Sequence, residues 1–111
     1  MLPPKNRINK KLFPEFMKKA KTFSSDNLNL KVAYSCQKNK SFAFVASLKV
    51  SKKAVERNKL KRRARAITYP LLERVPAGIC AAIFFKPAII GKKYAEIKDE
   101  LTILYKKAKI I

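Results

Sequence analysis

The sequence predicts a single α+β domain in which helices cover one face of a small sheet of about four strands. Two segments alternate apolar and polar residues as strands do, two longer segments repeat apolar residues at helical spacing, and one short run is apolar throughout. A chain of 111 residues supplies one modest core and is too short for two, so residues 1–111 are expected to form one domain. The expected order is α-β-β-β-α-β-α, a small α/β sandwich.

Residues 1–11 form a basic segment with two prolines, which is expected to be a mobile or loosely docked arm. A short helix should follow, with Pro14 in its first turn, where a missing N–H costs little. Its apolar face follows the spacing i, i+3, i+4, i+7 and consists of Phe13, Phe16, Met17 and Ala20.

Strands are predicted where apolar residues recur at every second position. Residues 28–34 place leucine, valine and tyrosine on one face and Asn29, Lys31 and Ala33 on the other. Residues 41–48 alternate in the same way, and we expect the two segments to pair as a hairpin. A short edge strand is expected around residues 22–23.

The second half of the chain should hold two longer helices and a central strand. Residues 52–68 are predicted to be helical, and Pro70 should end or kink this helix. Residues 78–85 are apolar on both faces, which is typical of a strand in the middle of a sheet. Residues 94–107 should form the last helix.

The cysteines and the hydropathy indicate no metal site and no membrane span. Cys36 and Cys80 lack metal-ligand spacing, and Cys80 is expected to be a buried free thiol. The longest apolar run, residues 79–85, is far shorter than the ~20 residues that cross a bilayer. No signal peptide is visible, so a cytoplasmic protein is expected.

Charge is the strongest compositional signal. There are 27 Lys and Arg against 7 Asp and Glu, which gives a net charge of +20. Such a chain attracts polyanions, with nucleic acid first and acidic membranes second. The absence of histidine excludes imidazole catalysis and histidine-ligated metals. The carboxylates are too scattered in the sequence to predict a self-sufficient two-metal nuclease.

The cations concentrate in residues 49–65, which contain nine Lys or Arg and one carboxylate. On a helix, Arg57, Lys61 and Arg65 stack at i, i+4 and i+8, with Asn58 beside them. Like charges at this spacing repel each other, whereas guanidinium groups bind phosphate in a bidentate manner. The pattern therefore indicates a helix that binds an anionic partner.

A resemblance to a known family rests on residues 49–65, which read KVSKKAVERNKLKRRAR, and on the preceding FAFVAS. They resemble the F-G-F-V-x-S-K-K strand and the R-N-R-x-K-R helix of the protein component of bacterial ribonuclease P. The segments PEFMKKAKTF and AAIFFKPA resemble the first helix and last strand of that family, so the similarity runs in order from about residue 5 to residue 108. Lys59, Met17 and Leu48 replace an arginine, an aromatic residue and a lysine of the family pattern.

This resemblance implies a fold and an activity. The fold would contain a left-handed βαβ crossover (ribosomal protein S5 domain 2-like). The protein would bind the catalytic RNA subunit of ribonuclease P and the 5′ leader of precursor tRNA. The RNA would carry out Mg2+-dependent endonucleolytic removal of the leader, with Mg2+ bound mainly by RNA. No catalytic residue of the protein, no membrane and no stable protein partner are expected.

The resemblance also implies residue roles. The expected contacts with the RNA subunit are Lys52, Lys53, Arg57, Asn58, Lys59, Lys61, Arg62 and Arg65. The expected contacts with the leader are Phe13, Met17, Lys31, Ala33, Ser47 and Lys49. Two alternatives share the charge and the fold class: a structural or ribosome-associated RNA-binding protein, and a DNA-binding protein that places the basic helix in the major groove.

Overall fold

The computed structural model of the chain describes residues 13–34 and 40–111, with side chains in the first helix from Phe16 onward. The elements are α1 (Phe13–Lys19), β1 (Lys21–Ser24), β2 (Leu28–Ala33), β3 (Ser41–Val45), α2 (Ala54–Thr68), η2 (Tyr69–Arg74), β4 (Cys80–Phe85), η3 (Pro87–Ile89) and α3 (Tyr94–Lys107). The predicted order is confirmed, and α3 has the predicted bounds. The basic arm, residues 1–11, lies outside the described residues.

The four strands form one mixed sheet in the order β1-β2-β4-β3. β4 is antiparallel to β2 and parallel to β3, so the predicted hairpin between β2 and β3 is wrong. The reason is that β4 is apolar on both faces and gains most from the central position, which it takes between the other two. The predicted edge strand is confirmed as β1, which pairs with β2.

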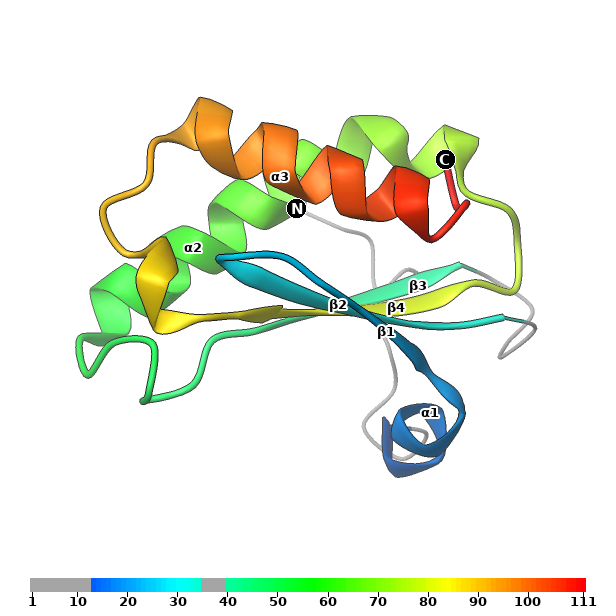
Figure 1. Cartoon of the computed structure of the whole chain (residues 1–111), viewed down its shortest axis with the longest axis horizontal. Coiled ribbons are helices and arrows are strands. Elements are labelled where there is room, and N and C mark those ends of the chain that lie inside the picture. The colour runs from blue at the N-terminus through cyan, green and yellow to red at the C-terminus, as the bar shows by residue number, and fades with distance from the viewer. Residues whose placement is uncertain (1–12, 35–39) are drawn as a thin grey trace.

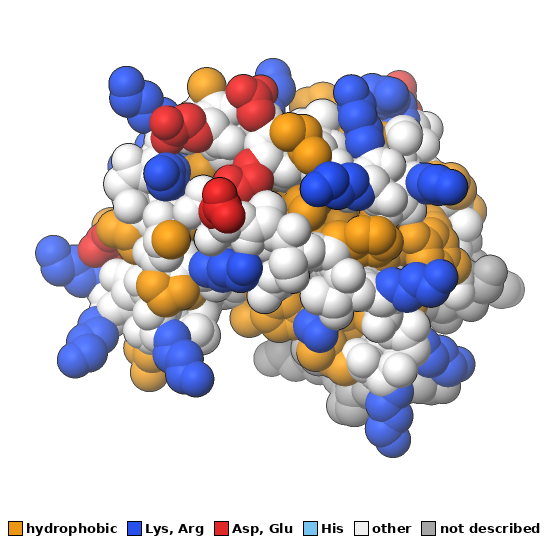
Figure 2. Space-filling model, in the orientation of Figure 1, with side chains coloured by type: hydrophobic (Ala, Val, Ile, Leu, Met, Phe, Trp, Pro, Cys, Tyr) orange, Lys and Arg blue, Asp and Glu red, His pale blue; other side chains and the backbone are white. Residues whose placement is uncertain are grey.

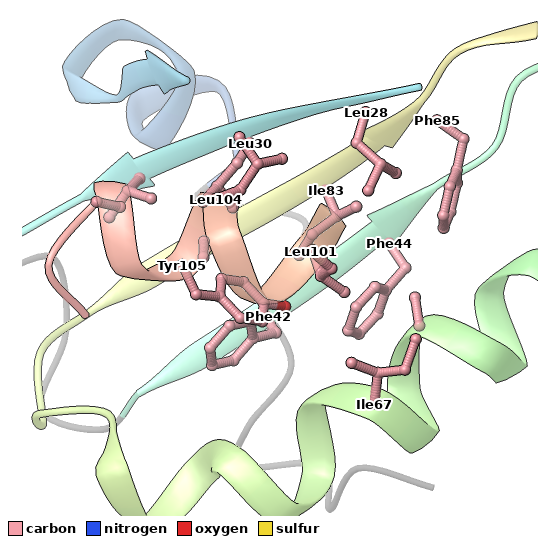
Figure 3. Packing of buried hydrophobic residues seen from close by; sticks show 14 of the residues in the cluster. Leu28, Leu30, Phe42, Phe44, Ile67, Ile83, Phe85, Leu101, Leu104 and Tyr105 are labelled. Carbon is pink, nitrogen blue, oxygen red and sulfur yellow. The ribbon is translucent and has the colours of Figure 1, made fainter. Parts of the chain in front are cut away.

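Helices lie on both faces of the sheet, and not on one face as predicted (Figure 1). α2 and α3 cover one face and enclose the main core, in which Phe42 and Tyr105 meet edge to face with ring centres 5.9 Å apart (Figure 3). α1 packs on the opposite face, where buried Phe16 contacts a small cluster of Ala33, Cys80 and Ala82. These small side chains leave room for a helix to approach the sheet.

The environments of Cys80 and Tyr34 differ from those expected. Cys80 is fully buried as predicted, but it is disulfide-bonded and is not a free thiol. Tyr34 was expected on the core face of its strand, yet it is 45% exposed. β2 ends at Ala33, so the alternation does not extend to Tyr34, whose hydroxyl donates to the carbonyl of Ala108 at 2.6 Å.

The core contains one buried polar pair, Thr68 and Tyr105, whose hydroxyl oxygens lie 2.7 Å apart. Burial raises the pKa of Tyr105 well above its ordinary value, and the hydrogen bond with Thr68 offsets part of that rise. The folded state therefore keeps this tyrosine neutral where the unfolded chain would ionise it. Its contribution to stability is present below the ordinary tyrosine pKa of about 10 and is lost as the pH rises above it.

We expect Tyr105→Phe to flatten the alkaline loss of stability. The variant should be less stable near neutral pH by about 1–3 kcal/mol, because the Thr68 hydroxyl loses its partner. Between about pH 9 and pH 11, its free energy of unfolding should fall less than that of the parent protein. Urea unfolding over this range, with Tyr69→Phe at an exposed tyrosine as control, measures the difference. Parallel curves for Tyr105→Phe and the parent protein would contradict the prediction.

Candidate nucleic-acid interface

α2 is held to the body of the protein by one face only. Leu60, Ala64, Ile67 and Thr68 are buried, and the helix packs against β3 and α3. The polar residues that separate them in the sequence project away from this stripe, as the helical period requires. The sequence therefore places the cations of α2 on the outside of a rigidly anchored helix.

The outer face of α2 brings several predicted residues together. An open depression of about 540 Å³ is lined by Val55, Asn58, Lys61, Arg62 and Arg65. Lys52 and Lys53 are exposed in the segment before the helix, whereas Lys59 projects from a different flank of α2. Acidic side chains gather over the first half of α3, and Lys and Arg side chains project around much of the remaining outline (Figure 2). The depression on α2 is itself lined by three cations, one amide and one apolar side chain, and by no carboxylate.

Two of the arginines expected to bind the RNA, Arg57 and Arg65, also make contacts within the protein. A guanidinium nitrogen of Arg57, Nη1, donates to the carbonyl oxygen of Ser51 at 2.8 Å, which ties the preceding loop to the helix. The guanidinium carbon of Arg65 lies 5.9 Å from the centre of the Phe44 ring, within reach of a cation–π interaction. These contacts restrict the side chains before any partner binds, which lowers the entropic cost of binding.

The second candidate surface is the part of the sheet that α1 leaves open. We define the open sheet face by the two rows next to the α1 contact. In strand order they are Thr22, Lys31 and Ala43, then Ser24, Asn29, Phe84 and Val45; Ala82, between Lys31 and Ala43, is fully buried in the small cluster and is not part of this face. The ammonium nitrogen of Lys31 donates to Thr22 Oγ1 at 3.3 Å. Exposed Ser47 and Lys49 follow β3 beyond the second row.

The predicted leader contacts have different environments here. Lys31 lies on the open sheet face, and Met17 packs at the edge of the small cluster beneath α1. Ala33 is only 2% exposed because Phe16 covers it, so it offers no surface to a ligand in this conformation. The side chain of Phe13 lies outside the described part.

The structure adds Asn29 and Phe84, which sequence reasoning did not select. They pair in register across β2 and β4 on the open sheet face. Asn29 Oδ1 is buried and has no hydrogen-bond partner, and the Phe84 ring is half-buried beside the small cluster. The alternation of apolar and polar residues in residues 28–34 predicts Asn29 on this face. It gives no such prediction for Phe84, because the run that contains it is apolar on both faces. An unpaired acceptor next to an aromatic ring is suited to a nucleobase.

Within residues 13–34 and 40–111, no group of three His, Cys, Asp or Glu side chains could hold a metal ion. Among the helices of these same residues, none is both long and apolar enough to cross a membrane.

Comparison with known proteins decides the family. The sequence model of the family described as Ribonuclease P matches residues 2–109. The chain belongs to the ribonuclease P protein family. The ribonuclease P protein component of Pseudanabaena sp. is 31% identical over 113 residues, which cover 100% of this chain and 97% of the relative. That of Microcystis aeruginosa is 44% identical over 70 residues, 63% of this chain and 58% of the relative.

Solved structures of ribonuclease P proteins share the fold. The Staphylococcus aureus protein superposes with a TM-score of 0.85 at 19% identity, covering 95% of this chain and 96% of that one. The Thermotoga maritima protein gives 0.76 at 19% identity, covering 90% and 96%. The α+β fold with a four-stranded mixed sheet is therefore that of ribonuclease P proteins.

Membership in this family confirms the resemblance seen in residues 49–65. The chain is the protein component of ribonuclease P, an endoribonuclease of tRNA processing, and its partner is the ribonuclease P RNA. The comparisons do not favour the alternative of a ribosome-associated protein.

Proposed function

We propose that α2 and the lysines before it bind the catalytic RNA, while the open sheet face and α1 bind the 5′ leader of precursor tRNA. The observation that supports this most strongly is the depression on α2, where Asn58, Lys61, Arg62 and Arg65 converge on a helix whose other face is buried. Guanidinium and ammonium groups offset phosphate repulsion between two large RNA molecules. Lys52, Lys53 and Arg57 would extend the same surface at the start of α2, and Lys59 would contact the RNA from a different flank of the helix.

The leader would lie across the open sheet face as a single strand. Lys31 and Lys49 would hold phosphates, because each presents an ammonium group at this face or at its end. Phe84 would stack on a base, and Asn29 Oδ1 would accept a hydrogen bond from a base N–H. Met17 and Ser47 would border the strand at opposite ends.

Bond breaking would belong to the RNA subunit. The side chains at both surfaces are mainly Lys, Arg, Asn and Phe, whereas Mg2+ prefers carboxylate and phosphate oxygens. These residues do not fit a Mg2+ site within the protein. We therefore assign the Mg2+ ions to the RNA and give the protein's own residues binding and orienting roles only.

Reconstitution tests this proposal. The purified protein alone should not cleave precursor tRNA, and the RNA subunit alone should need high Mg2+. Together they should cleave at the mature 5′ end at low Mg2+, because the protein supplies the countercharge that Mg2+ otherwise provides. Cleavage by the protein without RNA would disprove the division of labour. Sequencing of the RNA that co-purifies with the protein from cells distinguishes this proposal from the alternative, because a structural ribosomal protein would co-purify with ribosomal subunits.

A further inference from the structure

A second hollow lies on a different flank of α2, where the helix faces the turn that joins η3 to α3. Its volume is about 320 Å³, near the lower end of the ~300–1,000 Å³ of small-molecule sites. α2 contributes Lys59, Leu60 and Arg63, and the turn contributes Ile89, Lys92 and Lys93. It shares no lining residue with the depression around Arg62. We call it the η3 hollow.

The rim of the η3 hollow is strongly cationic. Lys59, Arg63, Lys92 and Lys93 line it together with a single carboxylate, that of Glu56. Glu56 Oε1 already accepts a hydrogen bond from Ser51 Oγ at 3.3 Å. Four cations around so small a space repel one another, and a bound anion would relieve that repulsion.

The floor of the hollow is apolar. Leu60 is 6% exposed and Ile89 is 1% exposed, while Ile90 forms a wall that is 40% exposed. The exposed part of Ile90 and the edge of Leu60 offer an apolar surface against which a nucleobase can pack, while Ile89 supports them from below, and the cations above can bind the attached phosphate. The hollow therefore combines the two features that a nucleotide needs.

The turn that closes the η3 hollow is held in place by backbone contacts. The N–H of Lys92 donates to the carbonyl of Ile89 at 3.1 Å, and Arg63 Nη1 donates to the carbonyl of Lys92 at 3.4 Å. Gly91 has a φ of +86°, which favours glycine at this point of the turn. The walls are therefore linked to each other before a ligand arrives.

We propose that the η3 hollow binds one unpaired nucleotide that projects from the ribonuclease P RNA. Its base would pack on Ile90 and the edge of Leu60, and its phosphate would lie between Arg63 and the two lysines. The small volume fits one nucleotide better than an extended peptide. α2 lies on the opposite side of the sheet from α1, so this contact is separate from the leader surface (Figure 1). The inference rests on the RNA partner and not on leader binding.

The test compares two double variants of equal charge change. Lys92→Ala/Lys93→Ala removes two exposed cations from the hollow, and Lys106→Ala/Lys107→Ala removes two from the far end of α3. We expect the first to weaken binding to the RNA about tenfold, and to reduce the slope of log affinity against log salt by about 0.7–0.9, which corresponds to one lost phosphate contact. The control should change affinity less than about twofold. Both double variants should have the same melting temperature as the parent protein.

A photo-crosslinking residue and free ligands test the proposed occupant. Benzoylphenylalanine at Ile90 should cross-link to one position of the RNA in the assembled complex. In titrations followed by NMR, adenosine monophosphate should bind the parent protein more tightly than inorganic phosphate, and Lys92→Ala/Lys93→Ala should abolish both.

Three results would overturn the inference: equal effects of the two double variants, cross-links scattered along the RNA, or equal affinity for phosphate and nucleotide, which would make the hollow a phosphate site only. The preference for leader-bearing over leaderless tRNA should stay unchanged in Lys92→Ala/Lys93→Ala. A failure here is therefore distinguishable from a failure of the leader proposal.

Discussion

Replacing Arg62 by alanine should weaken binding to the ribonuclease P RNA by about tenfold to a hundredfold. Arg62 is exposed in the depression on α2, next to Asn58, Lys61 and Arg65. A charge-assisted hydrogen bond to a phosphate contributes about 1.5–3 kcal/mol, which corresponds to this range. The loss of one phosphate contact should also reduce the slope of log affinity against log salt by about 0.7–0.9. Filter binding at several salt concentrations measures both quantities.

Three further variants separate binding from folding. Arg62→Lys keeps the charge but loses the bidentate geometry, so its affinity should fall between those of the parent protein and Arg62→Ala. Lys98→Ala removes an exposed cation from α3 and should bind normally. Arg57→Ala should lower the melting temperature as well as the affinity, because Arg57 also holds the carbonyl of Ser51. If the salt slope of Arg62→Ala equals that of the parent protein, Arg62 is not part of the interface.

The sequence predicted local elements well and strand pairing poorly. The apolar stripe of α3 and the doubly apolar β4 depend only on residues close in the chain. β4 is confirmed, and α3 buries Ile97, Leu101, Leu104 and Tyr105, whereas Tyr94, expected on the same face, is 41% exposed. The hairpin prediction assumed that neighbouring segments pair with each other. In the structure, β4 follows α2 in the chain and lies between β2 and β3, where both of its apolar faces are covered. Which strand lies inside the sheet depends on all four strands together, so it cannot be predicted from the residue pattern of a single strand.

In the candidate site, too, the features that depend on neighbouring residues could be predicted, and those that depend on tertiary packing could not. The cations of α2 lie close together in the sequence, so their shared exposure follows from the helical period. The open sheet face depends instead on where α1 docks. The amphipathic pattern of α1 indicates that one of its faces is buried, but it does not indicate which part of the sheet that face contacts. In the structure, α1 covers Ala33 and leaves Lys31 and Phe84 accessible. The η3 hollow likewise joins residues about 30 positions apart and has no sequence signal.

Phe84→Leu should reduce the affinity for leader-bearing precursor tRNA about tenfold and leave the affinity for leaderless tRNA unchanged. The aromatic ring of Phe84 lies half-buried on the open sheet face, in register with Asn29 and its unpaired oxygen. Stacking of a base on an aromatic side chain contributes about 1–3 kcal/mol, and leucine keeps the packing against the small cluster but offers no flat ring. Fluorescence titration of the holoenzyme with the two RNA substrates measures the ratio of affinities.

The chain offers a matched control on the other face of the same sheet. Phe23 of β1 is also partly buried, but it packs against the main core beneath α2 and α3. Phe23→Leu therefore makes the same chemical change at a comparable cost in packing, and it should leave leader discrimination intact. If both variants reduce discrimination equally, the effect comes from a loosened sheet. If neither does, the leader does not stack on Phe84, and its contacts lie with Lys31, Lys49 and α1 alone.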